Sequence, residues 1–130
     1  MERTGKHFRK RDAILNCVRC TTTHPSAEWV YENVRTQIPD ISLATVYRNL
    51  SLFKEQGLIR SLGTVNGVER FDGNTEPHVH FICQNCDAVI DLSQMAVPES
   101  IITQAANEVR GTVDTCQLSF GGVCQTCTQN

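Results

Sequence analysis

The chain has 130 residues, which suits one ordinary domain or two small ones, and each small domain alone would bury little apolar surface. It contains no run of about eighteen apolar residues, the length that spans a bilayer, and Met1–Lys6 lacks the apolar stretch of a signal peptide. We therefore expect a cytoplasmic protein with no membrane partner.

The formal net charge of −2 hides a difference between the two parts of the chain. Residues 1–60 carry ten Lys and Arg against six Asp and Glu, whereas residues 61–130 carry two against eight. A polyanion would therefore bind to the first part. The seven cysteines favour metal binding or redox chemistry, because persistent disulfides are rare in a reducing compartment.

Three helices are predicted in the first part of the chain. Apolar residues recur at helical spacing over Arg9–Cys20, and a second helix begins at Ser26 and ends before Pro39. The third is the best marked, with Ser42 as N-cap and Gly57 as the closing residue.

A β-hairpin is predicted to follow the third helix. The β-prone stretches Leu58–Leu62 and Val68–Phe71 flank the turn formers Asn66 and Gly67. Three helices followed by a hairpin describe a winged helix-turn-helix, and we assign it to residues 1–71.

The third helix is then the candidate recognition helix, which presents its N-terminal residues to base edges and phosphates. The basic cluster before the first helix would add salt-dependent phosphate contacts. A packed helix with a solvated Arg48 is the alternative. The predicted DNA contacts are Arg9, Lys10, Arg11, Ser42, Thr45, Tyr47 and Arg48.

A small α/β unit is predicted beyond a turn-rich hinge at residues 72–78. Strand candidates are residues 80–83, 88–92 and 113–120, and a helix is expected from about Pro98 to Val109. The predicted fold class is therefore α+β, with the winged helix-turn-helix followed by this small α/β unit at residues 79–130.

Two Cys-x-x-Cys pairs predict a structural zinc site, because each turn supplies two thiolates to a tetrahedral ion. The four residues are Cys83, Cys86, Cys124 and Cys127. Unrelated buried or redox-active thiols are the alternative. Cys17 and Cys20 match the same spacing, but Cys17 falls on an apolar helix face and is interpreted as a small buried residue. Cys116 lies in a predicted strand and stays unassigned.

Histidines and carboxylates near the hinge suggest a second metal site. His78 and His80 would share one face of a strand, with Asp72 and Asp91 nearby in sequence. Such ligands without a thiolate suit Fe(II) or Mn(II). Surface or merely hydrogen-bonded histidines remain an equal alternative, and His24 alone is interpreted as structural.

Several stretches of the chain resemble the ferric uptake regulator family of bacterial metalloregulators. They are Ser42–Leu50, Glu69–Asp72, His78–Cys86 and Gly122–Cys127. The resemblance implies a winged-helix domain, a dimerisation domain at residues 79–130 with zinc on the four cysteines, and a regulatory metal between the domains. The implied regulatory ligands are His24, Asp72, His78, His80 and Asp91.

Asp91 points to the peroxide-sensing PerR branch of that family, since iron-sensing members usually carry Glu there. The resemblance then implies that hydrogen peroxide reacts at bound Fe(II) and oxidises His24 or His78, whereas Mn(II) binds without reacting. We expect a homodimeric repressor that binds a palindromic operator when metal is bound. A sensor of iron or manganese level, and a small metalloenzyme, are the two competing hypotheses.

Overall fold

The computed structural model describes residues 5–129, and the chain divides into two compact units, Met1–Thr75 and Glu76–Asn130. We call them unit 1 and unit 2. The boundary between them falls within the predicted hinge at residues 72–78. Each unit is described by itself.

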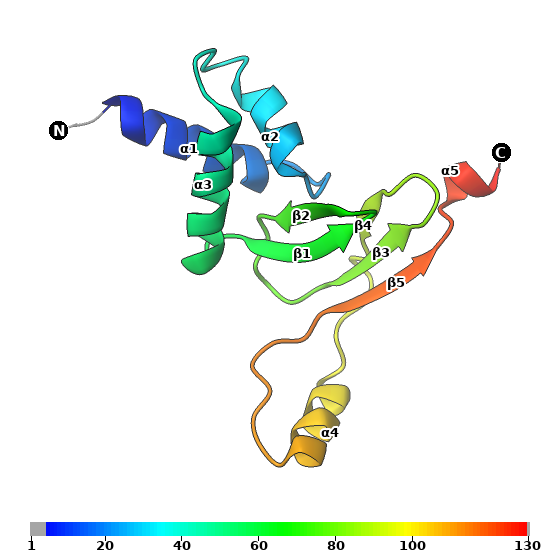
Figure 1. Cartoon of the computed structure of the whole chain (residues 1–130). Helices are drawn as coiled ribbons and strands as arrows, with labels where there is room; N and C mark the ends of the chain where they lie inside the picture. The colour runs from blue at the N-terminus through cyan, green and yellow to red at the C-terminus, as the bar shows by residue number, and fades with distance from the viewer. Residues whose placement is uncertain (1–4, 130) are drawn as a thin grey trace. The chain divides into compact units, whose positions relative to one another are not determined.

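Unit 1 begins with three helices, α1 (Gly5–Arg19), α2 (Ala27–Val34) and α3 (Leu43–Glu55) (Figure 1). The hydroxyl oxygens of Ser26 and Ser42 cap α2 and α3, each accepting a hydrogen bond of 3.1 Å from the backbone N–H three residues later. α2 ends at Val34, well before Pro39, because the Val34 carbonyl accepts from the amides of both Gln37 and Ile38 and closes a turn. The three predicted helices are confirmed, with two differences in their bounds. α2 has this shorter end, and α1 begins at Gly5 and not at Arg9, so the basic cluster Arg9–Arg11 lies within the helix and not before it.

The hairpin of unit 1 pairs β1 (Arg60–Val65) with β2 (Val68–Asp72) in antiparallel register. Asn66 and Gly67 connect the strands with φ angles of 53° and 82°, the left-handed conformation that a tight hairpin turn of type I′ requires. Asp72, where the predicted hinge begins, is the last residue of β2 and so belongs to the hairpin and not to a free linker.

The core of unit 1 draws residues from all three helices and from the hairpin. Val30, Val46, Leu50 and Phe53 are essentially inaccessible to solvent, and Phe71 brings β2 onto the same cluster. Burial of a large apolar side chain of this kind contributes about 1.5–3 kcal/mol. The winged helix-turn-helix predicted from the sequence is confirmed.

Unit 2 contains a three-stranded sheet in the order β4-β3-β5. The strands are β3 (Val79–Cys83), β4 (Val89–Asp91) and β5 (Leu118–Gly122); β3 pairs antiparallel with β4 and parallel with β5. The elements outside the sheet are α4 (Glu99–Val109), which stands apart from it in Figure 1, and α5 (Gln125–Thr128).

The last strand differs from its prediction. It was expected at residues 113–120, but β5 begins at Leu118, so Cys116 lies outside any strand. Leu118 pairs with Val79, the first residue of β3, and residues 113–117 therefore have no strand to pair with. Among the described residues, no helix combines the length and apolar composition needed to cross a bilayer.

Candidate metal centres and DNA-binding surface

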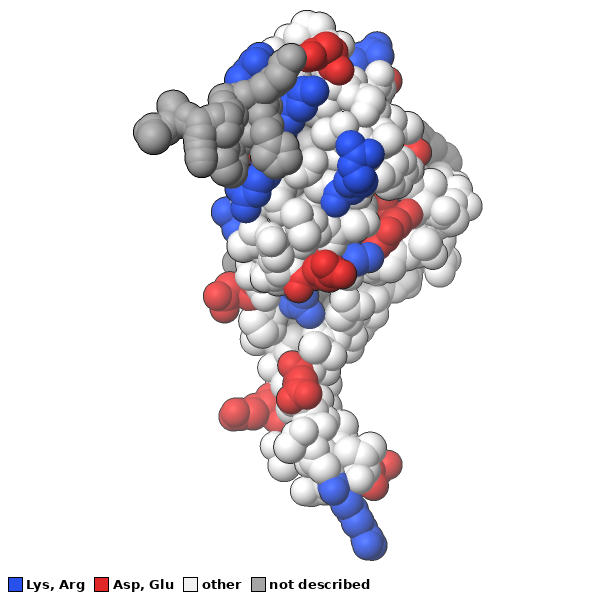
Figure 2. All heavy atoms as spheres, turned by 60° about the vertical axis from the view of Figure 1, so that its left-hand side comes forward, with Lys and Arg blue, Asp and Glu red and all other residues white. Residues whose placement is uncertain are grey.

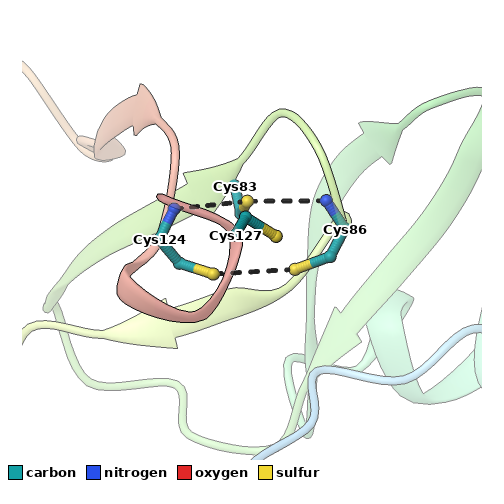
Figure 3. Close-up of side chains that lie close together, drawn as sticks. All are labelled: Cys83, Cys86, Cys124 and Cys127. Atoms are coloured by element: carbon teal, nitrogen blue, oxygen red, sulfur yellow. Dashed lines mark hydrogen bonds between the residues drawn. The ribbon is translucent and has the colours of Figure 1, made fainter. Parts of the chain in front are cut away.

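Four cysteines of unit 2 converge from two turns (Figure 3). Cys83 ends β3, Cys86 follows in the next turn, and Cys124 and Cys127 come from the start and body of α5. Their sulfur atoms all lie within 4.8 Å of one another, and those of Cys86 and Cys124 are 3.8 Å apart. A tetrahedral zinc with Zn–S bonds of about 2.3 Å holds its sulfurs about 3.8 Å apart, so the group fits zinc.

Backbone amides around Cys83 stabilise the thiolate form of its side chain. Its sulfur accepts hydrogen bonds from the amides of Asn85 (3.4 Å), Cys86 (3.5 Å) and Cys124 (3.4 Å). These donors, Cys124 first, lower the pKa of Cys83 to about 6. The Ala88 amide lowers the pKa of Cys86, but the neighbouring thiols of Cys83 and Cys127 outweigh it and raise that pKa to about 12. Four thiolates at this spacing therefore need a cation.

A second cluster in unit 2 joins two histidines to one carboxylate. His80 lies directly opposite Asp91 in the β3–β4 register, and His78 precedes β3 on the same face. The Nε2 atoms of His78 and His80 lie 3.3 and 3.2 Å from the same oxygen, Oδ1 of Asp91. Ligand atoms about 3 Å apart are what a metal with bonds of about 2.1 Å requires at adjacent positions.

The tautomer of His78 is fixed by the backbone. Its Nδ1–H donates to the Glu76 carbonyl at 2.6 Å, which leaves Nε2 as the basic nitrogen that faces Asp91. Such a hydrogen bond on the remote nitrogen commonly orients a metal-binding histidine. The cluster therefore offers two nitrogens and one carboxylate, without a thiolate, to a divalent ion.

Unit 1 holds a separate pair, His24 and Asp72. The two side chains are buried, and His24 Nε2 lies 3.5 Å from Asp72 Oδ2. The other carboxylate oxygen, Oδ1, accepts a hydrogen bond of 2.9 Å from the Asn74 amide, which fixes the carboxylate plane. The sequence alone gave no reason to pair His24 with Asp72, and only the family resemblance indicated it.

β2 holds the loop that carries His24. The Phe71 amide donates to the Pro25 carbonyl at 2.9 Å, so the loop lies beside the strand that ends at Asp72. The guanidinium group of Arg70 donates to the carbonyls of His24 and Thr23, the latter at 2.9 Å. His24 itself has φ of 54°. Sequence reasoning missed this role of Arg70, since no local pattern predicts hydrogen bonds to a distant loop.

The predicted recognition residues lie at the start of α3. The Ser42 hydroxyl is within 2.9 Å of the Thr45 hydroxyl, and Arg48 donates to Thr45 Oγ1 at 3.2 Å. Tyr47 is 45% exposed and donates to Glu28 Oε2 of α2 at 2.8 Å, a bond that raises the pKa of Tyr47. Ser42 therefore has a structural task as the helix cap as well as its predicted task at DNA.

Basic side chains gather on the face of unit 1 formed by α1 and α3, the side brought forward in Figure 2. Arg9 is exposed and donates to the Gln37 carbonyl at 3.3 Å, and Lys10 lies 4.0 Å from Asp40. Arg11 lies 3.3 Å from Asp12, and its guanidinium stands 5.2 Å from the centre of the Phe53 ring. Arg11 thus also packs on the core of unit 1.

Two cysteines belong to unit 1. Cys17 is half-buried against the apolar core, as its helix face predicts, and Cys20 is exposed just beyond the end of α1. Burial first, and then the charge of Cys20, raise the pKa of Cys17. Neither residue lies in a group of three or more potential metal ligands among the described residues.

A winged helix-turn-helix joined to a small unit with clustered metal ligands defines the class of metal-dependent DNA-binding regulators. The ferric uptake regulator family model matches residues 2–120, and the chain belongs to this family. Members are dimeric, DNA-binding transcriptional regulators and not enzymes, so the metalloenzyme hypothesis is set aside.

Two relatives carry names that refer to peroxide. The chain is 36% identical over 121 residues to the peroxide operon regulator of Bacillus subtilis (strain 168), covering 92% of this chain and 82% of the relative. It is 34% identical over 118 residues to the peroxide-responsive repressor PerR of Staphylococcus aureus (strain USA300), covering 91% and 79%.

Solved structures agree in fold. The crystal structure of the Campylobacter jejuni peroxide stress regulator matches with a TM-score of 0.80 and 25% identity, covering 94% of this chain and 91% of that one. The Vibrio cholerae ferric uptake regulator matches with a TM-score of 0.71 and 27% identity over 88% of each chain.

Proposed function

We propose that this regulator is a homodimeric repressor that binds a palindromic operator when a regulatory Fe(II) or Mn(II) is bound, and that hydrogen peroxide relieves the repression. The observation that carries the proposal is the thiolate-free group of His78, His80 and Asp91, whose ligand atoms converge at the spacing of metal ligands. The names of the two relatives support peroxide as the signal.

The regulatory site would combine ligands from both units: His24 and Asp72 from unit 1, and His78, His80 and Asp91 from unit 2. Two or three ligands alone would leave a divalent ion incompletely coordinated, whereas five would occupy most of its coordination positions. Metal binding would therefore favour one arrangement of the two units over others, as a ligand does when it binds one conformational state more tightly.

The structural metal would be a zinc ion on Cys83, Cys86, Cys124 and Cys127. The spacing of the sulfurs and the three amides on Cys83 support this assignment. Within unit 2, β3 links the two proposed sites, because it begins at Val79, between the two histidines, and ends at Cys83. The zinc would fix the far end of the strand that carries His80.

Peroxide sensing would be a two-electron oxidation at one ligand. Bound Fe(II) supplies the reactivity toward hydrogen peroxide. Overall, one oxygen atom of the peroxide is added to the imidazole ring of His24 or His78, a ring C–H bond becomes a C–O bond, and the second oxygen leaves as water. The oxidised ring binds metal poorly, so the protein would lose its metal and release DNA.

DNA recognition would use the start of α3, with Thr45, Tyr47 and Arg48 at base edges and Ser42 close by, and with Arg9, Lys10 and Arg11 on phosphates. Dimerisation would bury the apolar side chains that unit 2 exposes. α4 has no buried residue, and Ile101, Val109 and Phe120 are 40%, 66% and 44% exposed. Two copies related by a two-fold axis would read two half-sites of a palindrome.

The test compares zinc-loaded protein carrying Fe(II) or Mn(II), handled anaerobically, before and after hydrogen peroxide. We expect metal-dependent retardation of operator DNA. After peroxide, mass spectrometry should find one added oxygen on the His24 or His78 peptide of the Fe(II) form only. An Asp91→Glu variant should keep metal-dependent DNA binding but lose much of the peroxide response.

Two outcomes contradict parts of the proposal. If the Fe(II) form binds DNA but acquires no oxygen at His24 or His78, the protein is a sensor of metal level and not of peroxide. If neither metal changes DNA binding, the repressor mechanism itself is wrong.

A further inference from the structure

The proposed regulatory and zinc sites leave one chemically reactive pair unused, the cysteines Cys17 and Cys20 of unit 1. They stand three residues apart at the last turn of α1, and the Cys20 amide still donates to the Asn16 carbonyl at 2.9 Å. Helical geometry places Cα atoms at this separation about 5 Å apart. That distance lies within the roughly 4.4–6.8 Å range of disulfides.

The two thiols differ in a way that suits stepwise oxidation. Cys20 is exposed, whereas Cys17 is half-buried against the core of unit 1. Both line a groove of about 510 Å³ between α1 and α2, together with Trp29 and Asn33. A small oxidant can therefore reach Cys20, and Cys17 lies one helical turn away to complete a disulfide.

We propose that Cys17 and Cys20 form a reversible disulfide with hydrogen peroxide as oxidant, and that this disulfide is a second redox switch at the end of α1. The Cys20 thiolate attacks one peroxide oxygen and forms a sulfenic acid, and hydroxide leaves. The Cys17 sulfur then attacks the Cys20 sulfur, the S–S bond forms, and the sulfenic oxygen leaves as water. In sum, two thiols and one peroxide give one disulfide and two water molecules.

The last turn of α1 is tightly packed, so formation of the Cys17–Cys20 disulfide would displace its neighbours. A Cβ atom on Gly73 would lie 2.7 Å from Arg19 Cα and 2.9 Å from the Val18 carbonyl oxygen, so the backbone after β2 packs directly on this turn. Val18 is completely buried. Neighbouring Cβ atoms on a helix are about 5–6 Å apart, and a disulfide needs about 3.5–4.5 Å, so closing the bond must deform the turn.

That deformation would reach the proposed regulatory site. Gly73 follows Asp72 directly, and His24 lies four residues beyond Cys20. Moving the end of α1 therefore shifts both members of the His24–Asp72 pair, whose separation is now 3.5 Å. This consequence for DNA binding rests on the proposed function, whereas formation of the disulfide does not.

The experiment uses zinc- and Mn(II)-loaded protein, because the Mn(II) form should not oxidise its histidines. After hydrogen peroxide, free thiols are alkylated and the protein is cleaved with trypsin without reduction. Since Arg19 lies between the cysteines, trypsin separates them in reduced protein, whereas a disulfide keeps the two peptides joined. We expect joined peptides that dithiothreitol separates, with zinc content unchanged.

Operator affinity is measured on a portion of each peroxide-treated sample that is set aside before alkylation and cleavage. We expect a loss of about tenfold on oxidation, the equivalent of 1.4 kcal/mol, and recovery with dithiothreitol. Cys20→Ser and Cys17→Ser proteins should keep their affinity through the treatment, and Cys116→Ser, the matched control in unit 2, should respond as wild type.

Two results overturn the proposal. If Cys17 and Cys20 are both alkylated after peroxide exposure, no disulfide forms, whether or not the protein binds DNA. If the disulfide forms but wild-type and Cys20→Ser proteins lose equal affinity, the pair is not a switch. Because Cys20 is exposed, Cys20→Ser remains informative even where Cys17→Ser fails to fold.

Discussion

Arg70→Met should weaken both unit 1 and metal binding at the proposed regulatory site, because the Arg70 guanidinium group holds the loop that carries His24. The substitution removes the hydrogen bonds to the carbonyls of Thr23 and His24 while keeping an unbranched side chain of similar length. Hydrogen bonds from charged groups contribute about 1.5–3 kcal/mol each, but Arg70 is only half-buried, which reduces their value. We expect unit 1 to lose about 1–3 kcal/mol of stability.

The loss can be measured by thermal unfolding of zinc-loaded protein with and without Mn(II). For a unit of this size, 1 kcal/mol shifts Tm by about 4–8 °C. Since the loop also positions His24 beside Asp72, Mn(II) affinity measured by titration should fall by about tenfold. Arg35→Met is the matched control: Arg35 is exposed, and its contacts, an ion pair with Glu32 at 3.4 Å and a hydrogen bond to Tyr31, lie in solvent, so the substitution should change stability little. Equal Tm and Mn(II) affinity in both variants would refute the role assigned to Arg70.

Three further predictions concern stability and zinc. Gly73→Ala should destabilise unit 1 by about 1–3 kcal/mol in urea unfolding, because its Cβ would meet Arg19 Cα at 2.7 Å, whereas Gly111→Ala, with no neighbour nearer than 3.8 Å, should change little. The hydrogen bond from Ser61, and then the one from Lys54, lower the pKa of Glu69 below 4.5 in the folded protein. The ionised Glu69 therefore stabilises the fold above pH 4.5, and this stabilisation is lost as the pH falls through the lower pKa of the folded protein. Glu69→Gln should therefore be slightly less stable than wild type at pH 7, by under about 1 kcal/mol for this exposed pair, and the difference should vanish in acid. Cys83→Ser should abolish the tightly held zinc and impair dimerisation, whereas Cys116→Ser should retain both; a zinc-free but dimeric Cys83→Ser protein would separate dimerisation from the metal.

The parts of the fold that the sequence predicted well are those governed by local signals. Ser42 and Gly57 bound α3 because capping and left-handed closure depend on single residues and their immediate neighbours. The Asn66–Gly67 turn is likewise local. The four cysteines of the proposed zinc site come from two turns far apart in the chain, yet the Cys-x-x-Cys spacing of each turn is visible in the local sequence.

Other features depend on partners that are distant in sequence. The strand expected at residues 113–120 begins late, because its extent is set by where β3 begins, at Val79. Apart from the family resemblance, His24 is recognisable as a candidate ligand only through β2, whose Phe71 amide and Arg70 side chain hold its loop. No periodicity or spacing around residue 24 carries that information.

The distribution of ligands between the units gives the two proposed metals different tasks. The four cysteines of the proposed zinc site all lie in unit 2. The buried apolar residues of this unit, among those described, are limited to Val79, Cys83 and Val89. A unit with so small a core needs a further source of stability, and a zinc ion would supply it. The histidines and aspartates of the proposed regulatory site are instead divided, two in unit 1 and three in unit 2, so neither unit alone would complete that site. Loss of zinc should therefore unfold unit 2, whereas loss of the regulatory metal should leave both units folded and change only the coupling between them. Under the proposed mechanism, oxidation of one histidine would remove a single ligand from a divided set, and it would release the operator without unfolding either unit.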